Sequence, residues 1–490
     1  MRLVTDKENC TGCGACLNAC SRDAIEMVVS EDEGCVYPYI DDAKCIQCGL
    51  CEQVCCRRET NGNRRMESYI ARAKQSDMLA ESTSGGVFAV IAEQVIRLGG
   101  SVWGAILTDE LYVKHIRATN IEKLQKIKKS KYVQSGLDKI FVDIKRELDA
   151  DEMVLFSGLP CQIAGLRAFL GKTYSNLLLV DVICHGVPGE GIWREYLNYM
   201  EDENQKIVSF EFRSKDNGWD QLFVKYKTES GKVVKKESLE DLYMSGFYRN
   251  ITLRESCYNC KFKGDNYCSD ITLGDCWGYE SITGNENDNK GMSVVLLNTS
   301  NGQKFMEYIM DDLVIVSAIT ESQLKMHNRR LFTSVEKPVA REKFLRLFES
   351  QQYKKAFENL KRKDRNKMYI DTLSQWLRMK ISNPFFVREY FEKNSINKIA
   401  VYGMGTLGEC LCEELLSSGM QIEFCIDNSY PKLYRDCIQV VSVNDLDSNM
   451  SDKIDCIIVT PIHVYEEIAA NLSEGFEGKI ISLTDMITKL

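Results

Sequence analysis

Two cysteine runs near the N-terminus constrain this sequence more than any other feature. Both have the spacing C-x2-C-x2-C-x3-C, and they comprise Cys10, Cys13, Cys16 and Cys20, followed by Cys45, Cys48, Cys51 and Cys55. This spacing brings thiolates around 4Fe-4S clusters, and the fourth cysteine of each run ligates the cluster of the other run. We therefore expect one cluster on Cys10, Cys13, Cys16 and Cys55 and a second on Cys45, Cys48, Cys51 and Cys20.

Zinc sites and disulfides are the alternatives for these runs. Zinc ribbons usually have two separated C-x2-C pairs, which this pattern lacks. Gly12, Gly14 and Gly49 lie between the cysteines, where they suit a tightly folded backbone. A proline commonly follows the fourth cysteine, and here Ser21 and Cys56 take that place, so Cys56 competes with Cys55 as a ligand. The spacing still favours two iron–sulfur clusters, which transfer electrons singly.

Length and composition limit the class of protein. A chain of 490 residues is too long for one core and predicts about three domains. The 62 basic residues are outnumbered by 71 acidic ones, which argues against nucleic acid as a partner.

The cysteine content bears on the cellular compartment. The chain has 21 cysteines and opens MRLVTDKENC, without a charged and then apolar leader. Free thiolates need reducing surroundings, so we expect an anaerobic, cytoplasmic protein. Apolar stretches are too short to cross a bilayer, so we expect no membrane insertion.

The order of motifs predicts a multidomain α/β chain. We expect an α+β ferredoxin domain over 1–66, an α/β module over 67–344, a helical connector over 345–397 and a Rossmann-like α/β domain over 398–490. Hydrophobic patterning predicts a helix over 87–98. It also predicts strands over 24–29, 36–40, 101–107, 153–156, 177–183, 399–402, 422–426, 456–459 and 479–483.

A small-residue loop, Ser82–Gly86, opens the predicted helix over 87–98. Free N–H groups and the positive end of the helix dipole suit a phosphate or the pyrophosphate of a flavin. The alternative is an ordinary helix cap.

Two predicted strands of the central module end in loops that carry Cys161 and Cys184. Such loops meet at one edge of a sheet, where α/β ligand sites form. A C-x2-C pair, Cys257 and Cys260, adds two thiols, so a third cluster is a candidate. Buried cysteines are otherwise small apolar residues. His185 is either a proton relay beside a cofactor or a satisfied polar side chain.

The C-terminal region contains a glycine turn of the type that binds dinucleotides. A predicted strand enters Gly403, Gly405 and Gly408, and Asp427 ends the next strand, about twenty residues further on, where the ribose would bind. We therefore expect a Rossmann-like fold, with a nucleotide or NAD(P) as the candidate ligand.

The central module resembles the beta subunit family of coenzyme F-420 hydrogenases and dehydrogenases, in its bacterial form with a fused dicluster ferredoxin. The resemblance covers about 68–346 and rests on the stretches STSGGVF, SKYVQS, FSGLPCQIAGL, VICHGVP, CYNCKF and SDITLGDCWG. It implies FAD and a 4Fe-4S cluster in this module, with the flavin exchanging hydride with a deazaflavin or similar coenzyme.

The resemblance also implies site residues. The ligands of the third cluster would be Cys161, Cys184, Cys257 and Cys260, although Cys268 or Cys276 could replace one of them. The flavin site would be formed by Ser84, Gly85, Gly86, Lys131, Tyr132, Gln134, Ser135 and, close by, Asp275.

Three functional hypotheses follow. The first is an FAD- and iron–sulfur-dependent oxidoreductase that exchanges electrons with a partner protein or low-potential carrier, and its substrate is a deazaflavin or a nucleotide-linked molecule of a surface-polysaccharide or nucleotide-sugar pathway. The second is a polyferredoxin adaptor without flavin. The third makes the C-terminal domain a nucleotide sensor or docking domain.

Overall fold

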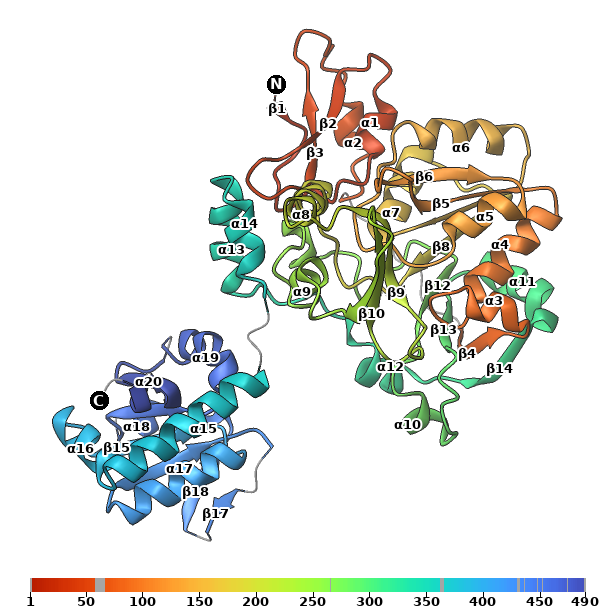
Figure 1. Ribbon diagram of the computed structural model, residues 1–490. Helices are drawn as coiled ribbons and strands as arrows, with labels where there is room; N and C mark the ends of the chain where they lie inside the picture. The colour runs from red at the N-terminus through yellow and green to blue at the C-terminus, as the bar shows by residue number, and fades with distance from the viewer. Residues whose placement is uncertain are drawn as a thin grey trace. The chain divides into compact units, whose positions relative to one another are not determined.

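The computed structural model divides the chain into two compact units, Met1–Lys361 and Arg362–Leu490 (Figure 1). It describes residues 2–57, 67–264, 266–361, 365–429, 432–435, 437–446, 448–451, 453–473 and 475–488. The predicted domain boundary after residue 66 falls beside 58–66, outside the described residues. Among the described helices, none has the length and apolar character required to span a bilayer.

The first unit begins with a small antiparallel sheet in the order β1-β3-β2, built from β1 (Arg2–Leu3), β2 (Ile25–Val29) and β3 (Val36–Ile40). The strands predicted over 24–29 and 36–40 are confirmed. Two short helices, α1 (Ala15–Ala19) and α2 (Leu50–Gln53), follow Gly14 and Gly49, whose φ angles are 75° and 74°. Glycine tolerates this left-handed turn without steric cost, so each cysteine run folds back directly into a helical turn.

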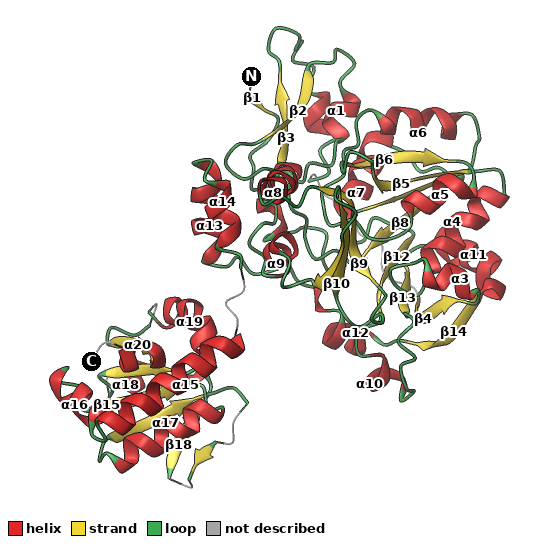
Figure 2. Ribbon diagram, in the orientation of Figure 1, coloured by secondary structure: helices red, strands yellow, loops and turns green. Residues whose placement is uncertain are grey.

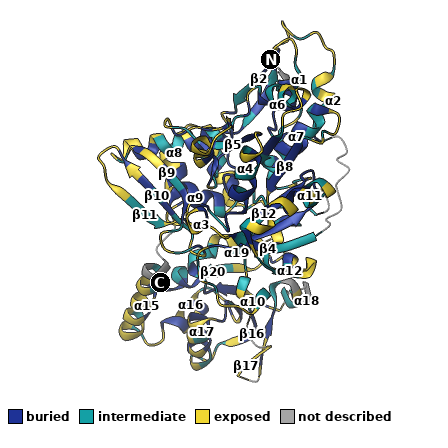
Figure 3. Cartoon of the chain, turned by 90° about the vertical axis from the view of Figure 1, so that its right-hand side faces the viewer, coloured by how far each residue is buried: buried dark blue, intermediate teal, exposed yellow. Residues whose placement is uncertain are grey.

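An eight-stranded sheet in the order β14-β4-β13-β12-β8-β7-β5-β6 forms the core of the first unit. The four central strands β5, β7, β8 and β12 are parallel to one another. The outer strands, β6 on one side and β13, β4 and β14 on the other, pair antiparallel. Nearly all of β8 is buried, as expected for a parallel strand covered on both faces (Figure 3). The bounds are β4 (Glu67–Ala73), β5 (Ser101–Leu107), β6 (Val113–Ala118), β7 (Val154–Gly158), β8 (Leu177–Val182), β12 (Ile271–Asp275), β13 (Ser293–Leu297) and β14 (Leu313–Ala318).

Helices cover both faces of this sheet (Figure 2). One face packs against α4 (Val87–Arg97), α5 (Ile121–Ile127) and α11 (Ser300–Ile309). The other face packs against α6 (Ile140–Asp149) and α7 (Pro160–Leu170). Helix α1 of the cysteine-rich part contacts α6 and α7 in turn. The N-terminal part thus forms an additional layer outside α6 and α7.

A second antiparallel sheet, β11-β10-β9, completes the unit with its own aromatic core. Its strands are β9 (Ile207–Ser214), β10 (Phe223–Thr228) and β11 (Val233–Glu237). The remaining helices are α3 (Ser76–Ala80), α8 (Glu190–Asp202), α9 (Leu242–Tyr248), α10 (Tyr279–Thr283), α12 (Glu321–His327), α13 (Ala340–Glu349) and α14 (Tyr353–Glu358).

The structure corrects the helical connector expected over 345–397. Helices α13 and α14 belong to the first unit, because Phe344, Phe348 and Phe357 are buried in the core of the second sheet. Helices α15 (Arg365–Ser382) and α16 (Phe386–Lys393) belong to the second unit, because Trp376 and Phe386 pack into its core. Apolar residues at helical spacing revealed the helices but not the core that each one joins.

The second unit is an open sheet in the order β17-β18-β16-β15-β19-β20. All neighbouring strands are parallel except β17 and β18. From β15 the strands β16 and β18 are added on one side and β19 and β20 on the other, which is a doubly wound arrangement. Its elements are β15 (Lys398–Tyr402), α17 (Thr406–Ser417), β16 (Gln421–Ile426), β17 (Leu433–Tyr434), β18 (Ile438–Val441), α18 (Ser448–Ser451), β19 (Cys456–Val459), α19 (Tyr465–Leu472), β20 (Lys479–Ser482) and α20 (Leu483–Thr488).

Candidate functional site

A cavity of about 530 Å³ lies at the carboxyl ends of β7, β8 and β12. This is the edge at which α/β sheets bind ligands, and the volume is typical of a small-molecule site. The loop before α4, the segment after α5 and the end of α9 close the cavity from other sides. Its lining includes Ser84, Gly86, Lys131, Tyr132, Ser135, Cys184, His185 and Asp275, all expected from the sequence.

The loop before α4 contributes Ser84 and Gly86 to the cavity, together with the first turn of the helix. Gly86 has a φ angle of 78° and caps the eleven-residue helix. Gly85 is a correction to the expected site, because it is not among the lining residues. Its N–H donates to Ser293 Oγ at 2.9 Å, and a Cβ there would lie 2.7 Å from the backbone nitrogen of Ser293. Gly85 thus allows the loop to pack on β13.

The lining of the cavity is rich in basic side chains. Lys131 donates to the carbonyl oxygens of Lys126, Ile127 and Lys128 at 2.8 to 3.0 Å, so it caps the C-terminal end of α5. Burial, with a smaller contribution from Lys129, lowers its pKa to about 7. The basic lining residues are Lys128, Lys129, Lys131, Arg213, Arg329 and Arg330. Phosphate groups are the natural ligands of such a surface.

Asp275 holds a basic residue in place rather than facing the cavity as a free acid. Its carboxylate accepts from Arg213 and, at 2.9 Å, from Trp219 Nε1. The Arg213 guanidinium lies 5.1 Å from the ring of Trp277, which stacks on Trp219. Sequence reasoning missed Arg213, because it lies in β9 of the second sheet with no motif around it.

Three histidines line the cavity, namely His115, His185 and His327. The Nε2 atom of His185 lies 2.7 Å from Asn250 Oδ1, and burial lowers the pKa of His185 to about 4. Sequence reasoning missed His115, an isolated histidine in β6. Its Nε2 lies 2.9 Å from the carbonyl oxygen of Ser157, and its Nδ1 is buried without a hydrogen-bond partner. Burial lowers the pKa of His115 to about 4 as well, so both rings are neutral near pH 7.

Gln134 is the second correction to the expected flavin site. It lies outside the cavity lining and is 5% exposed. Its Nε2 donates to the carbonyl oxygen of Thr11 at 3.1 Å, and its Oε1 accepts from Arg254 at 2.6 Å. The neighbouring Ser135 does line the cavity and accepts from Gln162. Within 130–135, Gln134 thus differs from its neighbours, which line the cavity, because its side chain reaches the first cysteine run.

Four cysteines of the central module lie close together beside the cavity. Burial raises the pKa of the Cys161 thiol well above its usual value, and the neighbouring thiols of Cys184, Cys260 and Cys257 raise it further. Cys184 lines the cavity itself. Cys268 instead neighbours Arg167 and Asp181, and Cys276 neighbours Asp275. The arrangement offers four thiols to one cluster, and their role as ligands stays a prediction.

The N-terminal cysteines form two groups. Burial raises the pKa of Cys16, and the thiols of Cys13, Cys10 and Cys55 raise it further, so the fourth cysteine of the second run joins the first three of the first run. Cys20, Cys45 and Cys51 pack against Ile25 and Ile40, and Cys48 is exposed.

In the described part of the chain, no three His, Cys, Asp or Glu side chains are arranged to hold a metal ion. A four-iron cluster holds its thiolates farther apart than a single ion does, so this result concerns single-ion sites. The all-thiol donor sets and the left-handed glycines beside them fit iron–sulfur clusters.

The first cysteine group lies next to the cysteines of the central module. A Cβ on Gly165 of α7 would lie 2.9 Å from Cys13 Sγ. The pKa of Cys161 is raised by Cys13 as well as by its own group, and that of Cys56 by Cys13 and by Cys161. Cys56 is buried between the two groups, where it contacts Thr11 Oγ at 3.6 Å.

The glycine turn of the second unit has the geometry that the sequence predicted. A Cβ on Gly403 would lie 2.5 Å from Pro461 Cδ, and one on Gly408 would lie 1.9 Å from the carbonyl oxygen of Gly403, whereas one on Gly405 would meet no atom within 4 Å. Asp427 accepts from the backbone N–H of Met404 at 2.8 Å. Gly405 therefore leaves the turn open to an approaching group, and nucleotide binding stays a prediction.

Comparisons with known proteins agree with these features. Residues 151–322 match the C-terminal domain of the beta subunit of coenzyme F420 hydrogenase/dehydrogenase. Residues 9–58 match a 4Fe-4S dicluster domain, and 395–481 match a domain described as C2185-like, N-terminal. The chain thus carries the C-terminal domain of the F420 hydrogenase/dehydrogenase beta subunit family behind an N-terminal 4Fe-4S dicluster domain.

Two individual proteins are similar to part of this chain. The chain is 24% identical over 319 residues to a coenzyme F420-dependent sulfite reductase of Methanocaldococcus jannaschii, which covers 61% of this chain and 46% of the relative. It therefore spans about half of that relative's length. A chain of the F420-reducing NiFe hydrogenase complex of Methanosarcina barkeri matches 61% of this chain and 92% of its own length, at 14% identity and a TM-score of 0.37.

Proposed function

We propose that the protein is an iron–sulfur flavoprotein oxidoreductase, which couples hydride transfer at FAD in the cavity to single-electron transfer by 4Fe-4S clusters. Bound FAD would supply the exchange between two-electron and one-electron chemistry. The observation that carries the proposal is the continuous arrangement of the cavity and the two cysteine groups. Cys184 lines the cavity, and Cys161 of the same group neighbours Cys13 of the N-terminal part.

The residues around the cavity fit a flavin dinucleotide. Gly86 and the first turn of α4 would bind its pyrophosphate. Lys128 and Lys129 line the same cavity, although Lys128 pairs with Glu81 and Glu93 and Lys129 pairs with Glu211. His115, with a neutral ring and an unpartnered Nδ1, is suited to hydrogen-bond a heterocycle. Tyr132, which packs against Phe247 at a ring distance of 4.8 Å, would support the ring from one side. His185 is the candidate for holding a proton beside the reacting atoms.

We infer that the hydride partner is a deazaflavin coenzyme. Arg213, Arg329 and Arg330 extend the cationic lining beyond the α4 loop, so a second anionic molecule has a place to bind. The name of the Methanocaldococcus jannaschii relative supports this choice. A nucleotide-linked substrate of a polysaccharide pathway is the alternative hypothesis, and it depends on a ligand of the second unit. The exposed Cys48 marks the surface where a redox partner would exchange electrons.

Anaerobic purification, with iron, sulfide and extracted flavin measured on one sample, tests the proposal. We expect about twelve irons and one FAD per chain, the content of three 4Fe-4S clusters and one flavin. About eight irons and no flavin in folded protein would instead support the polyferredoxin adaptor.

Two buried cysteines of the same module provide a matched pair for this assay. Cys161→Ser should lower the iron content by about four per chain, because it removes a ligand of the central cluster. Cys268→Ser should leave the iron content unchanged, because Cys268 lies with Arg167 and Asp181. Equal iron content in both variants would contradict the assignment of the central ligands.

A further inference from the structure

Arg254 is a buried arginine without a carboxylate partner among the described residues. It is 1% exposed. Its guanidinium donates to the carbonyl oxygens of Cys10 at 3.2 Å and Val36 at 2.6 Å, and to Gln134 Oε1 at 2.6 Å. All three acceptors are neutral, and the guanidinium also lies 4.5 Å from the centre of the Tyr37 ring. The hydrogen bonds are thus satisfied, but no carboxylate of the described residues compensates the full charge. A buried charge is strongly unfavourable unless an opposite charge compensates it.

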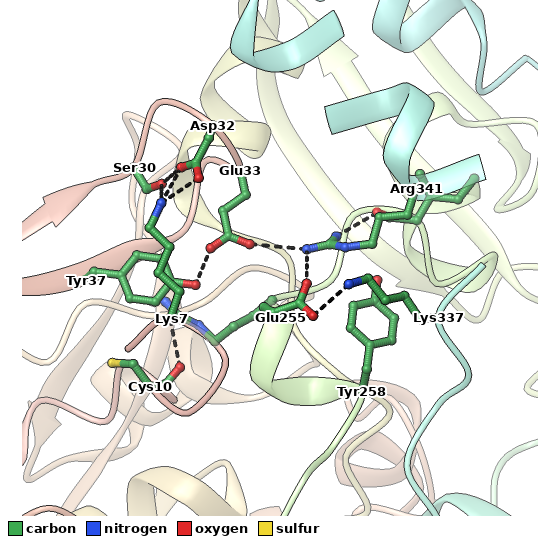
Figure 4. A network of polar contacts seen from close by, with 12 residues as sticks. Lys7, Cys10, Ser30, Asp32, Glu33, Tyr37, Glu255, Tyr258, Lys337 and Arg341 are labelled. Carbon is green, nitrogen blue, oxygen red and sulfur yellow. Dashed lines mark hydrogen bonds and ion pairs between the residues drawn. The ribbon is translucent and has the colours of Figure 1, made fainter. Parts of the chain in front are cut away.

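Arg341 is a second buried arginine between the N-terminal part and the central module, and it has carboxylate partners (Figure 4). It is as deeply buried as Arg254, but its Nη2 lies 3.2 Å from Glu33 and 3.4 Å from Glu255. Glu33 also accepts from Tyr37, and Glu255 pairs with Lys337 at 2.8 Å. Two carboxylates therefore neutralise Arg341. The counter-charge of Arg254 must come from something other than a carboxylate of this network.

The surroundings of Arg254 identify that counter-charge. The Arg254 side chain contacts the carbonyl of Cys10, and its own carbonyl accepts from the N–H of Cys257 at 2.9 Å. Gly12, between Cys10 and Cys13, permits this approach, since a Cβ there would lie 2.8 Å from Arg254 Nη2. Arg254 thus lies between the first N-terminal cysteine group and the cysteine group of the central module.

We propose that Arg254 is a positioning residue that supplies the positive counter-charge for the cluster on Cys10, Cys13, Cys16 and Cys55 and for the neighbouring central cluster. Thiolate-ligated clusters carry net negative charge, and that charge increases by one when an electron is added. A fixed cation in a water-poor interface favours the reduced state and raises the reduction potential. The role at the first cluster depends on the dicluster match alone, and the role at the central cluster rests on the proposed function.

Redox titration of the purified holoprotein, followed by electron paramagnetic resonance, tests this role. Arg254→Gln removes the charge, and Arg254→Lys keeps it. Gln134→Glu leaves Arg254 in place and adds a carboxylate at the atom that already accepts its hydrogen bond. The cluster on Cys20, Cys45, Cys48 and Cys51 is an internal reference, because its cysteines make no contact with Arg254 among the described residues.

We expect Arg254→Gln and Gln134→Glu to lower the ratio of reduced to oxidised first cluster about tenfold at a fixed solution potential, which is 59 mV for a one-electron couple. Arg254→Lys should stay close to wild type, and the reference cluster should not shift. If Arg254→Gln loses iron while Arg254→Lys retains it, the requirement for charge is also supported.

Unchanged potentials in iron-replete Arg254→Gln and Gln134→Glu would overturn the proposal. Loss of iron from both arginine variants, with Gln134→Glu at the wild-type potential, would overturn it as well. A preparation with about eight irons and no flavin would contradict the proposed function but leave the shift at the first cluster measurable, so the two failures are distinguishable.

Discussion

His115 and His185 illustrate how single residues of the cavity acquire their properties from burial. Both side chains have a pKa lowered to about 4, with burial as the largest cause. The hydrogen bond from His115 Nε2 to the carbonyl oxygen of Ser157 opposes the shift but does not cancel it, because the imidazolium would lose most of its hydration. The cavity therefore offers neutral nitrogen atoms beside cationic side chains, a combination suited to a heterocycle that carries phosphates.

This burial predicts a pH dependence of stability. The pKa of His115 is lower in the folded protein, so the unfolded chain binds more protons below about pH 6.5 and stability falls as the pH decreases. We expect acidification from pH 7.5 to 5.5 to cost about 1 kcal/mol at this residue. In anaerobic denaturant unfolding, His115→Gln should reduce the loss by that amount.

His327→Gln is the control, because His327 also lines the cavity but is only half-buried. This variant keeps the buried His115, so it should retain the pH-dependent loss of stability that is attributed to His115. If His115→Gln and wild type lose the same stability between the two pH values, the His115 ring is not held neutral by burial.

At the scale of elements, the glycines of the turn between β15 and α17 are expected to have two different roles, close packing and ligand binding. Gly403 and Gly408 are required because neighbouring atoms occupy the space of a Cβ, whereas the space beside Gly405 is open. In dinucleotide-binding turns the middle glycine is the one that lets the backbone approach a pyrophosphate. Substitution of Gly408 should therefore lower stability, whereas substitution of Gly405 should weaken nucleotide binding.

Gly408→Ala should destabilise the second unit by roughly 3 kcal/mol, because its Cβ would lie 1.9 Å from the carbonyl oxygen of Gly403. Gly405→Ala should leave its stability within about 0.5 kcal/mol of wild type. Hydrogen exchange of β15 and β16 measures both effects in the full chain.

Gly405→Ala should also weaken the binding of any nucleotide that protects the unit of wild type. A nucleotide that protects wild type and Gly405→Ala equally would contradict a binding site at this turn. Equal hydrogen exchange in Gly408→Ala and wild type would contradict the close packing of helix and strand.

At the scale of the whole first unit, the N-terminal cysteine-rich part is integrated into the central module. The carbonyl oxygen of Gly34 accepts from the N–H of Gly191 at 2.8 Å, and a Cβ on Gly189 would lie 2.1 Å from the same oxygen. Asn18 donates to the carbonyl oxygen of Asp138 at 2.8 Å. The two parts therefore share an interior, and we expect them to unfold together.

Two arginines of α13 test this integration. Arg341→Ala should lower the stability of the first unit by about 3 kcal/mol, because it leaves Glu33 and Glu255 without their shared cation. Arg346→Ala removes only an exposed pair with Glu342 and should change stability by less than about 0.5 kcal/mol. Unfolding can be followed anaerobically by circular dichroism and by cluster absorbance. Cluster loss in Arg341→Ala at a lower denaturant concentration than sheet unfolding would contradict a shared interior.

The sequence by itself determined the features that depend on local backbone geometry. The spacing of Cys10, Cys13 and Cys16 predicts a cysteine-rich loop, and the strands over 101–107 and 456–459 were predicted with the bounds that the structure has. The glycine turn at 403–408 was recognised for the same reason. In each case neighbouring residues contain the whole signal.

Only the tertiary structure decided which side chains meet across long separations. Gln134 and Thr11 are 123 positions apart, and their contact places Gln134 outside the cavity to which the family resemblance had assigned it. Arg254 and Cys10 are 244 positions apart, and no local pattern marks their contact. Sheet order and layer packing determine such pairs, because they bring together segments whose own sequences contain no information about one another.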